Sequence, residues 1–109
     1  MKLLILKLNT RASKECWILN KNYHRDDGLV AVISASESRF FYNYGKLHRD
    51  GGPAVLLNDG AQAWHQNGNT HRDDGPAIIE LDGEKSWYLN GLSYSEKDFY
   101  SELRKRENK

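Results

Sequence analysis

The stretch Asn67-Gly68-Asn69-Thr70-His71-Arg72-Asp73-Asp74-Gly75-Pro76-Ala77 decides the fold, because the chain repeats its central motif. His-Arg-Asp-x-Gly stands at 24–28, 48–52 and 71–75, at intervals of 24 and 23 residues. Intervals of this length are typical of stacked supersecondary units that share one core. A residue that recurs in every unit is more often scaffold than catalytic, because a catalytic group is normally needed once.

The composition predicts one nearly neutral domain. The 109 residues include 16 Lys and Arg and 15 Asp and Glu, for a formal net charge of +1. This length suits a single domain with a modest core, and this charge argues against a nucleic-acid partner. The one cysteine, Cys16, cannot form an internal disulfide, which favours a cytoplasmic location, the host cytoplasm if a phage encodes the chain. The apolar run 3–6 is too short for a signal peptide or a membrane span.

An aromatic residue marks each unit. Trp17, Phe41 and Trp64 stand seven places before the three histidines, and Trp87 stands seven places before Tyr94. Residues at equivalent places in stacked units lie next to one another. We therefore expect the four aromatic residues to line one continuous apolar spine.

Turn signals divide the units into strands. Asn-Gly at 67–68 and 90–91 favours tight turns, because both residues tolerate positive φ, and Lys21 takes the glycine place in the first unit. The expected strands are 15–19, 29–33, 39–43, 53–57, 62–66, 76–81 and 85–89. The first unit has one more residue between its motif glycine and the next aromatic residue than the other units have. We assign that residue to a longer hairpin loop at 34–38, because loop tips tolerate insertions.

Alternation within the strands predicts the core, and the ends of the chain predict two caps. The expected core residues are Val30, Val32, Ala54, Leu56, Ala77, Ile79 and Leu81. Residues 1–14 predict a strand that closes one end, 15–94 the repeats, and 95–109 a helical cap. The helix is expected over 96–106, with Ser95 as its N-cap. The sequence thus predicts a single-domain, mostly β protein, with a twisted antiparallel sheet of three hairpin repeats of about 23 residues and a C-terminal helix.

The repeats resemble the variant MORN repeats of bacterial and bacteriophage proteins. That family has a consensus near W-Y-x-N-G-x-x-H-R-x-D-G-P-A, and the similarity is clearest at 67–77, 81–83 and 87–91. The first unit departs from it, with Lys21 in place of the turn glycine and Leu29 in place of proline. The resemblance implies a sheet built from hairpins, and protein binding more often than catalysis.

The repeated residues are interpreted as structural. The set comprises His24, His48, His71, Arg25, Arg49, Arg72, Asp26, Asp50, Asp73, Gly28, Gly52, Gly75, Trp17, Phe41, Trp64 and Trp87. The histidines are spaced as repeats and not as a metal-ligand pair, so we predict hydrogen bonds that anchor loops, and no metal or other cofactor. The Arg-Asp pairs predict a ladder in which each arginine bridges to its own loop or to the next unit; the alternative is a charged active surface. Cys16, beside Trp17 in an expected strand, is predicted to be a buried, unreactive thiol.

The residues outside the repeat pattern are the better candidates for binding. Phe40, Tyr42 and Tyr44 alternate along one strand, and His65 and Tyr88 stand at the place equivalent to Tyr42. If the spine faces inward, Tyr42, His65 and Tyr88 face outward together as an aromatic row. Tyr is enriched in binding hot spots, so the row is a candidate protein interface. The alternative is that the C-terminal helix or a second subunit covers this face.

These observations predict a protein that is not an enzyme. The leading hypothesis is a small phage or mobile-element protein that binds and inhibits a host protein, such as a component of a defence system like CRISPR; this step is an analogy from family and size. A second hypothesis is a self-assembling structural, scaffold or antitoxin-like protein that forms a homo-oligomer. A third is a hydrolase that uses the row of His and Asp in the loops.

Overall fold

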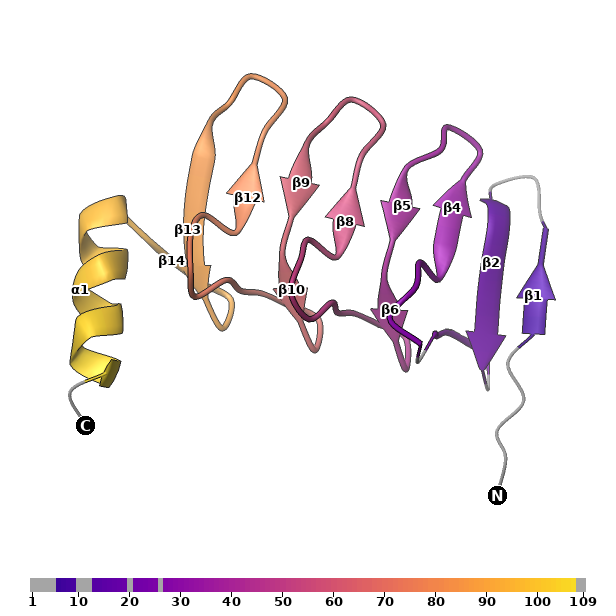
Figure 1. The fold of residues 1–109 in the computed structure, drawn as a ribbon, viewed down its shortest axis with the longest axis horizontal. Helices are drawn as coiled ribbons and strands as arrows, with labels where there is room; N and C mark the ends of the chain where they lie inside the picture. Colours follow the sequence, from indigo (N-terminus) through magenta and orange to yellow (C-terminus); the bar gives the residue numbers. More distant parts are fainter. Residues whose placement is uncertain (1–5, 10–12, 20, 26, 108–109) are drawn as a thin grey trace.

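The computed structural model describes residues 6–9, 13–19, 21–25 and 27–107. Within them the chain is mostly β, an antiparallel sheet of many short strands followed by one C-terminal helix, α1 (Glu96–Glu107). The molecule is a thin plate, with extents of 44 × 38 × 17 Å. Figure 1 shows the units side by side along the plate, with α1 at one end.

The repeats consist of alternating tall and short hairpins. The tall hairpins are β4–β5 (Val32–Ser34 and Arg39–Phe40), β8–β9 (Val55–Leu56 and Gln62–Ala63) and β12–β13 (Ile78–Ile79 and Lys85–Leu89). The short hairpins are β2–β3 (Ser13–Leu19 and Asn22–Tyr23), β6–β7 (Tyr42–Asn43 and Lys46–Leu47), β10–β11 (His65–Gln66 and Asn69–Thr70) and β13–β14 (β14, Leu92–Tyr94). The first strand along the chain is β1 (Leu6–Leu8).

Neighbouring tall hairpins join into one sheet. Its order is β1-β2-β4-β5-β8-β9-β12-β13-β14, with antiparallel pairs throughout. The units repeat one register, since Arg39 lies opposite Leu56 and Gln62 lies opposite Ile79. An isolated hairpin is only marginally stable in water, so each unit depends on the backbone partners that its neighbours supply.

The aromatic residue divides the second strand of a unit. The N–H of Phe41 donates to the carbonyl of Ala54 in the next unit (2.8 Å), while the carbonyl of Phe41 accepts from the N–H of His48 (2.9 Å). Equivalent bonds recur at Trp17 (to Ala31 and from His24) and at Trp64 (to Ala77 and from His71). The chain thus changes partners at the aromatic residue, and the single strands expected at 39–43 and 62–66 are each two short strands.

The extra residue of the first unit does not lie in the hairpin loop, so that prediction was wrong. The loops between the last paired residues are 34–38, 57–61 and 80–84, and all have the same length. Glu37 adopts a φ of 69° where the second loop has Gly60 at 100°. Because Ala31 is the equivalent of Ala54, the extra residue lies between Gly28 and Ala31. The sequence misled because 34–38 lacks the usual turn residues yet forms the same turn.

The core is thinner than the strand pattern predicts. Ala31, Ala54 and Ala77 are fully buried, and Val32 is 6% exposed. The predicted core residues Val30, Leu56 and Ile79 are only half-buried, and Leu81, which lies in the hairpin loop at 80–84, is 68% exposed. The plate is only 17 Å thick, and small alanines suit its close-packed centre.

The predicted aromatic spine is buried only in part. Phe41 is 8% exposed, whereas the three tryptophans are half-buried. The four residues do occupy equivalent places in the stacked units, as their shared backbone bonding shows. Their remaining surface has to be covered by neighbouring polar residues or by solvent, because the described residues form no opposing apolar layer on a plate 17 Å thick.

Different elements close the two ends of the plate. The N-cap is confirmed, since the backbone N–H of Asp98 donates to Ser95 Oγ (3.1 Å), and α1 runs to Glu107, one residue beyond the expected end. Phe99 on α1 is fully buried, and the helix packs on β13 and β14. At the other end β1 pairs with β2, while the parts of the predicted N-terminal cap at 1–5 and 10–12 lie outside the described residues.

Candidate functional site

In the turns at 44–45, 67–68 and 90–91, both N–H groups donate to the preceding unit. The first turn residue donates to a histidine ring, and the glycine that follows donates to a backbone carbonyl. The ring bonds run from Tyr44 to His24 Nδ1 (2.9 Å), from Asn67 to His48 Nδ1 (3.0 Å) and from Asn90 to His71 Nδ1 (3.0 Å). The carbonyl bonds run from Gly45 to Tyr23, from Gly68 to Leu47 and from Gly91 to Thr70, each 2.8 or 2.9 Å long. The repeated histidines therefore join each unit to the next.

These bonds restrict the chemistry of the rings. A neutral imidazole has one acceptor nitrogen and one N–H donor. Since Nδ1 accepts the turn N–H, the proton lies on Nε2, which in His48 is 3.2 Å from Asp50 Oδ1. A ring in this state has no free lone pair with which to remove a proton from a substrate. The same holds at His24 and His71, so base catalysis by any of the three would require the loss of a joint between units.

Each repeated arginine lies over the aromatic residue of its own unit. The guanidinium carbon is 4.2 Å from the ring centre for Arg25 on Trp17, 4.0 Å for Arg49 on Phe41 and 3.9 Å for Arg72 on Trp64. Stacks of this kind are attractive and cover ring surface that would otherwise face water. Arginine thus supplies part of the missing second layer, a role that the sequence analysis did not predict.

The expected Arg-Asp ladder is present in the first and third loops, at 24–28 and 71–75, where each arginine bridges to a carboxylate of its own loop. Arg25 Nε bonds to Asp27 (3.0 Å) and Arg72 Nε to Asp74 (2.7 Å), in each case two residues on and not the adjacent Asp. In these two loops the guanidinium lies over the aromatic ring of its unit while Nε bonds to the second Asp of the motif and not to the first. Asp50 bonds to His48, no ion pair of Asp73 with an arginine is found in the described residues, and Asp26 lies outside them.

The motif glycines are not equivalent to one another. A Cβ at Gly52 or Gly75 would lie 3.0 Å from the guanidinium carbon of Arg49 or Arg72, so both glycines make room for the stack. A Cβ at Gly28 would meet nothing within 4 Å, and Gly28 has a φ of 76°. The extra residue before Ala31 shifts the first loop, and Gly28 therefore serves the turn and not the arginine.

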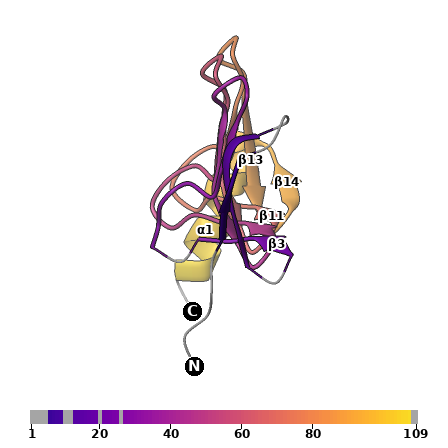
Figure 2. The same cartoon turned by 90° about the vertical axis from the view of Figure 1, so that its right-hand side faces the viewer.

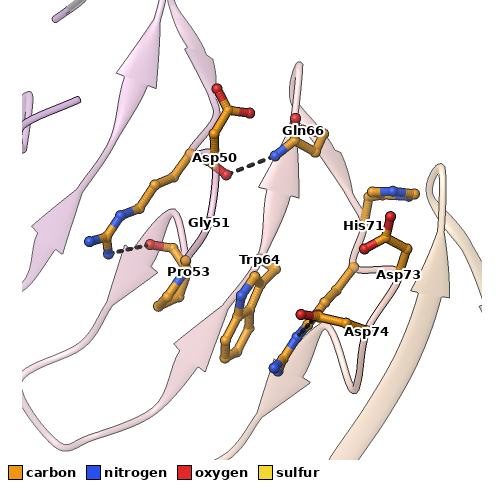
Figure 3. Close-up of a pocket in the computed structure, with 11 residues that line it drawn as sticks. Asp50, Gly51, Pro53, Trp64, Gln66, His71, Asp73 and Asp74 are labelled. Carbon is orange, nitrogen blue, oxygen red and sulfur yellow. Dashed lines mark hydrogen bonds and ion pairs between the residues drawn. The ribbon is translucent and has the colours of Figure 1, made fainter. Parts of the chain in front are cut away.

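Grooves separate the loops that contain the His-Arg-Asp motif, on one flank of the plate. From here on the first, second and third loops are those at 24–28, 48–52 and 71–75. In Figure 2 the loops curve outward on the side opposite the short hairpins β3, β11 and β14. The larger groove, of about 480 Å³, lies between the second and third loops; its lining includes Trp64, Gln66, His71, Gly51 and Asp73. Figure 3 shows Trp64 at its centre, with Asp50 and Asp73 at its rim. Gln66 Nε2 donates to the carbonyl of Arg49 (2.7 Å) and fixes one wall. A smaller groove of about 170 Å³ lies between the first and second loops.

The short hairpins form a second candidate surface on the opposite flank. Tyr44 is 61% exposed and Tyr23 is 38% exposed, and the rings of Tyr23 and Tyr42 are 5.1 Å apart. The Tyr44 ring lies 4.2 Å from the His24 ring. We call Tyr23, Tyr42 and Tyr44 the turn-face tyrosines. Tyr23 was missed because it lies outside the strand on which the sequence analysis placed its aromatic row.

The predicted aromatic row is present at equivalent places but is not an exposed surface. The carbonyls of Tyr42, His65 and Tyr88 accept the N–H groups of Arg25, Arg49 and Arg72. All three side chains are half-buried, as is that of Phe40. Phe40 and Tyr42 pack on the buried cluster of Cys16, Ala31 and Val32.

Burial also affects ionisation along this row. It raises the pKa of the Tyr42 phenol, with the nearby Tyr23 adding to the effect. It lowers the pKa of His65, against a smaller opposing effect of the Ala63 backbone. His65 Nδ1 is buried and has no hydrogen-bond partner among the described residues. Of the five proposed interface residues, only Tyr44 is largely exposed.

Other candidate chemistry is limited in the part of the chain that the structure describes. Cys16 is a free thiol, 2% exposed, as the sequence analysis expected. No group of three or more His, Cys, Asp or Glu side chains among these residues could hold a metal ion. None of their helices is long and apolar enough to cross a membrane.

Comparison with known proteins identifies no similar protein. No protein-family description, curated protein or solved structure matches this chain. The functional argument therefore rests on the two surfaces described above.

Proposed function

We propose that this chain is a protein-binding repeat module that contacts its partner through the turn-face tyrosines. The observation that carries the proposal is Tyr44. It is 61% exposed and has a φ of 50°, in a turn where the later units have Asn67 and Asn90 at nearly the same φ. A large exposed ring thus occupies a place that the fold itself fills with asparagine.

This placement is unfavourable for folding alone. Left-handed backbone costs a non-glycine residue on the order of 1–3 kcal/mol, and asparagine tolerates it better than a bulky residue does. Contact with the His24 ring, at 4.2 Å, recovers only part of that cost, because most of the Tyr44 side chain faces solvent. A strained, exposed tyrosine beside two others is the arrangement expected of a binding hot spot.

Two features of the loop flank support binding over catalysis. The three repeated histidines use Nδ1 to hold the units together, so they are unsuited to act as bases. The larger groove is lined by Arg, Asp, Gly, Pro, Trp, Gln and His, and so offers no hydroxyl or thiol nucleophile among the described residues. A hydrolase with a serine, threonine or cysteine nucleophile would need one of these groups.

The class of partner is proposed from family and size. The chain resembles repeats found in bacterial and bacteriophage proteins, and it is short and nearly neutral. We propose a host protein as the partner, such as a component of a defence system, which a phage or mobile-element protein would bind and inhibit.

Affinity capture from a bacterial lysate tests the proposal with one decisive variant, Tyr44→Asn. This change gives the turn the asparagine that stands at the equivalent places 67 and 90, so we expect a free energy of unfolding within about 1 kcal/mol of the wild type. We expect the wild type to enrich one protein and Tyr44→Asn to lose it. Tyr100→Ala is the matched control, since Tyr100 is an exposed tyrosine on α1. Equal capture by wild type and Tyr44→Asn would refute the turn face as the binding surface.

Self-assembly remains a second candidate because one sheet edge is open. Arg39 and Gln62 each pair with the first strand of the next tall hairpin. Among the described residues, no strand pairs with the outer edge of Lys85 and Ser86, the equivalent part of β13. Such edges can accept a further strand from another chain. The mass in solution separates the two functions: a defined oligomer that persists on dilution supports assembly, and a monomer supports the binding module.

A further inference from the structure

The second loop lacks a carboxylate that the other two loops contain. Arg25 bonds through Nε to Asp27 at 3.0 Å, and Arg72 bonds through Nε to Asp74 at 2.7 Å. The residue two places after Arg49 is Gly51. Among the described residues no carboxylate forms an ion pair with Arg49. The second loop therefore holds an arginine whose usual internal partner is missing.

The Arg49 guanidinium is nonetheless held in place as firmly as the others. It lies 4.0 Å from the centre of the Phe41 ring, and its Nη1 donates to the carbonyl of Pro53 (3.1 Å). Arg72 makes the equivalent Nη1 bond to Pro76 (3.0 Å) and also bonds to a carboxylate. A positioned guanidinium loses little side-chain entropy when it binds an anion.

The place of the missing carboxylate is open. A Cβ added at Gly51 would meet no atom within 4 Å, although the backbone there has a φ of 81°, which Asp27 and Asp74 do not share. Gly51 and Arg49 both line the larger groove, of about 480 Å³, so the space is continuous with solvent (Figure 3). Because Arg49 lines this groove, an anion from outside can approach it there.

The surrounding charges favour a monoanion. The Asp50 side chain is 86% exposed and bonds to His48, and Asp73 is exposed on the facing loop. These two carboxylates would repel a phosphate dianion or a nucleic-acid backbone, whereas a single carboxylate resembles the group that the sister loops already bind.

We propose that Arg49 binds an Asp or Glu side chain of a partner protein, in the groove between the second and third loops. The carboxylate takes the position relative to Arg49 that Asp27 and Asp74 take relative to their arginines. This inference rests on the proposed protein-binding function and adds a second contact on the opposite flank from Tyr44.

The test is an NMR titration of the Arg49 Nε–Hε resonance with two blocked tripeptides, acetyl-Gly-Asp-Gly-amide and acetyl-Gly-Asn-Gly-amide. We expect a saturable shift with the Asp peptide. The Asn peptide should bind at least about fivefold more weakly, because an ionised acceptor strengthens the hydrogen bond. The Arg72 resonance should not move, because Asp74 already occupies its Nε. Equal shifts with the two peptides would overturn the proposal, and a larger shift with inorganic phosphate at the same concentration would overturn the choice of carboxylate.

Variants separate this site from general charge effects. Arg49→Lys keeps the charge but removes Nε–H and should weaken binding of the Asp peptide about tenfold, while Arg72→Lys is the matched control and should leave that binding unchanged. Undiminished binding by Arg49→Lys would contradict the proposal. The titration contains no partner protein, so its failure would leave capture through Tyr44 standing, and loss of that capture would leave the titration intact.

Discussion

Replacement of His24 tests whether the repeated histidines hold the units together. His24 is fully buried, and its Nδ1 accepts the N–H of Tyr44 at 2.9 Å. His24→Ala removes a buried ring and leaves that N–H without its acceptor. We expect the lost packing to cost about 2 kcal/mol, less than the 3–5 of a buried Phe→Ala because imidazole is smaller and more polar. The unpaired N–H should cost about 1 kcal/mol more, since the turn is only partly buried.

The sum of about 3 kcal/mol is large against the ~5–15 kcal/mol that stabilises an ordinary domain. Urea unfolding followed by tryptophan fluorescence measures it, because Trp17, Trp64 and Trp87 report on three of the units. His24→Asn is the matched control, since its side-chain carbonyl oxygen can lie near the position of Nδ1 and accept the same N–H. We expect Asn to recover about 1 kcal/mol relative to Ala. Equal destabilisation by His24→Ala and His24→Asn would refute the contribution of the hydrogen bond and attribute the whole effect to lost packing.

Three other predictions follow from the same structure. Lys21 takes a φ of 68° where the later units have glycine, so Lys21→Gly should raise the free energy of unfolding by about 1 kcal/mol; a loss of stability would contradict the strain argument. Gly75→Ala places a Cβ 3.0 Å from the Arg72 guanidinium and should cost about 1–2 kcal/mol by displacing it from Trp64, whereas an unchanged urea midpoint would show that the stack can shift freely. Burial lowers the folded-state pKa of His65, so its stabilising contribution is complete above the unfolded pKa of about 6.5 and decreases as the pH falls from there toward the folded pKa. His65→Gln should reduce this loss of stability on acidification, and identical pH profiles would argue against it.

The sequence was informative where a residue type has one common structural role. Asn-Gly at 67–68 and 90–91 forms turns with positive φ at both residues, because few other dipeptides adopt that backbone at low cost. Ser95 caps α1 as its position before Glu96 and Asp98 indicates. The loop-anchoring role of the histidines also follows from their spacing, since a residue needed in every unit must serve the stack.

The sequence was less informative where one backbone position accepts several residue types. Glu37 adopts the left-handed conformation that Gly60 adopts, so the loop at 34–38 did not look like its equivalents. The expected outward-facing row failed because side chains beside the turn, such as Tyr42, pack on the units next to them. Gly51 is a difference that the sequence shows directly, since it stands two places after Arg49, where the other two loops have Asp27 and Asp74.

The most direct test of the central claim is the dissociation constant of the captured partner, measured by calorimetry for wild type, Tyr44→Asn and Tyr100→Ala. Loss of a hot-spot tyrosine costs at least about 2 kcal/mol, so we predict that Tyr44→Asn weakens binding by about 30-fold or more while its unfolding midpoint stays near the wild type. Tyr100→Ala should bind as the wild type does. Unchanged affinity in Tyr44→Asn, or an equal loss in Tyr100→Ala, would contradict the claim that this protein binds its partner through the turn-face tyrosines.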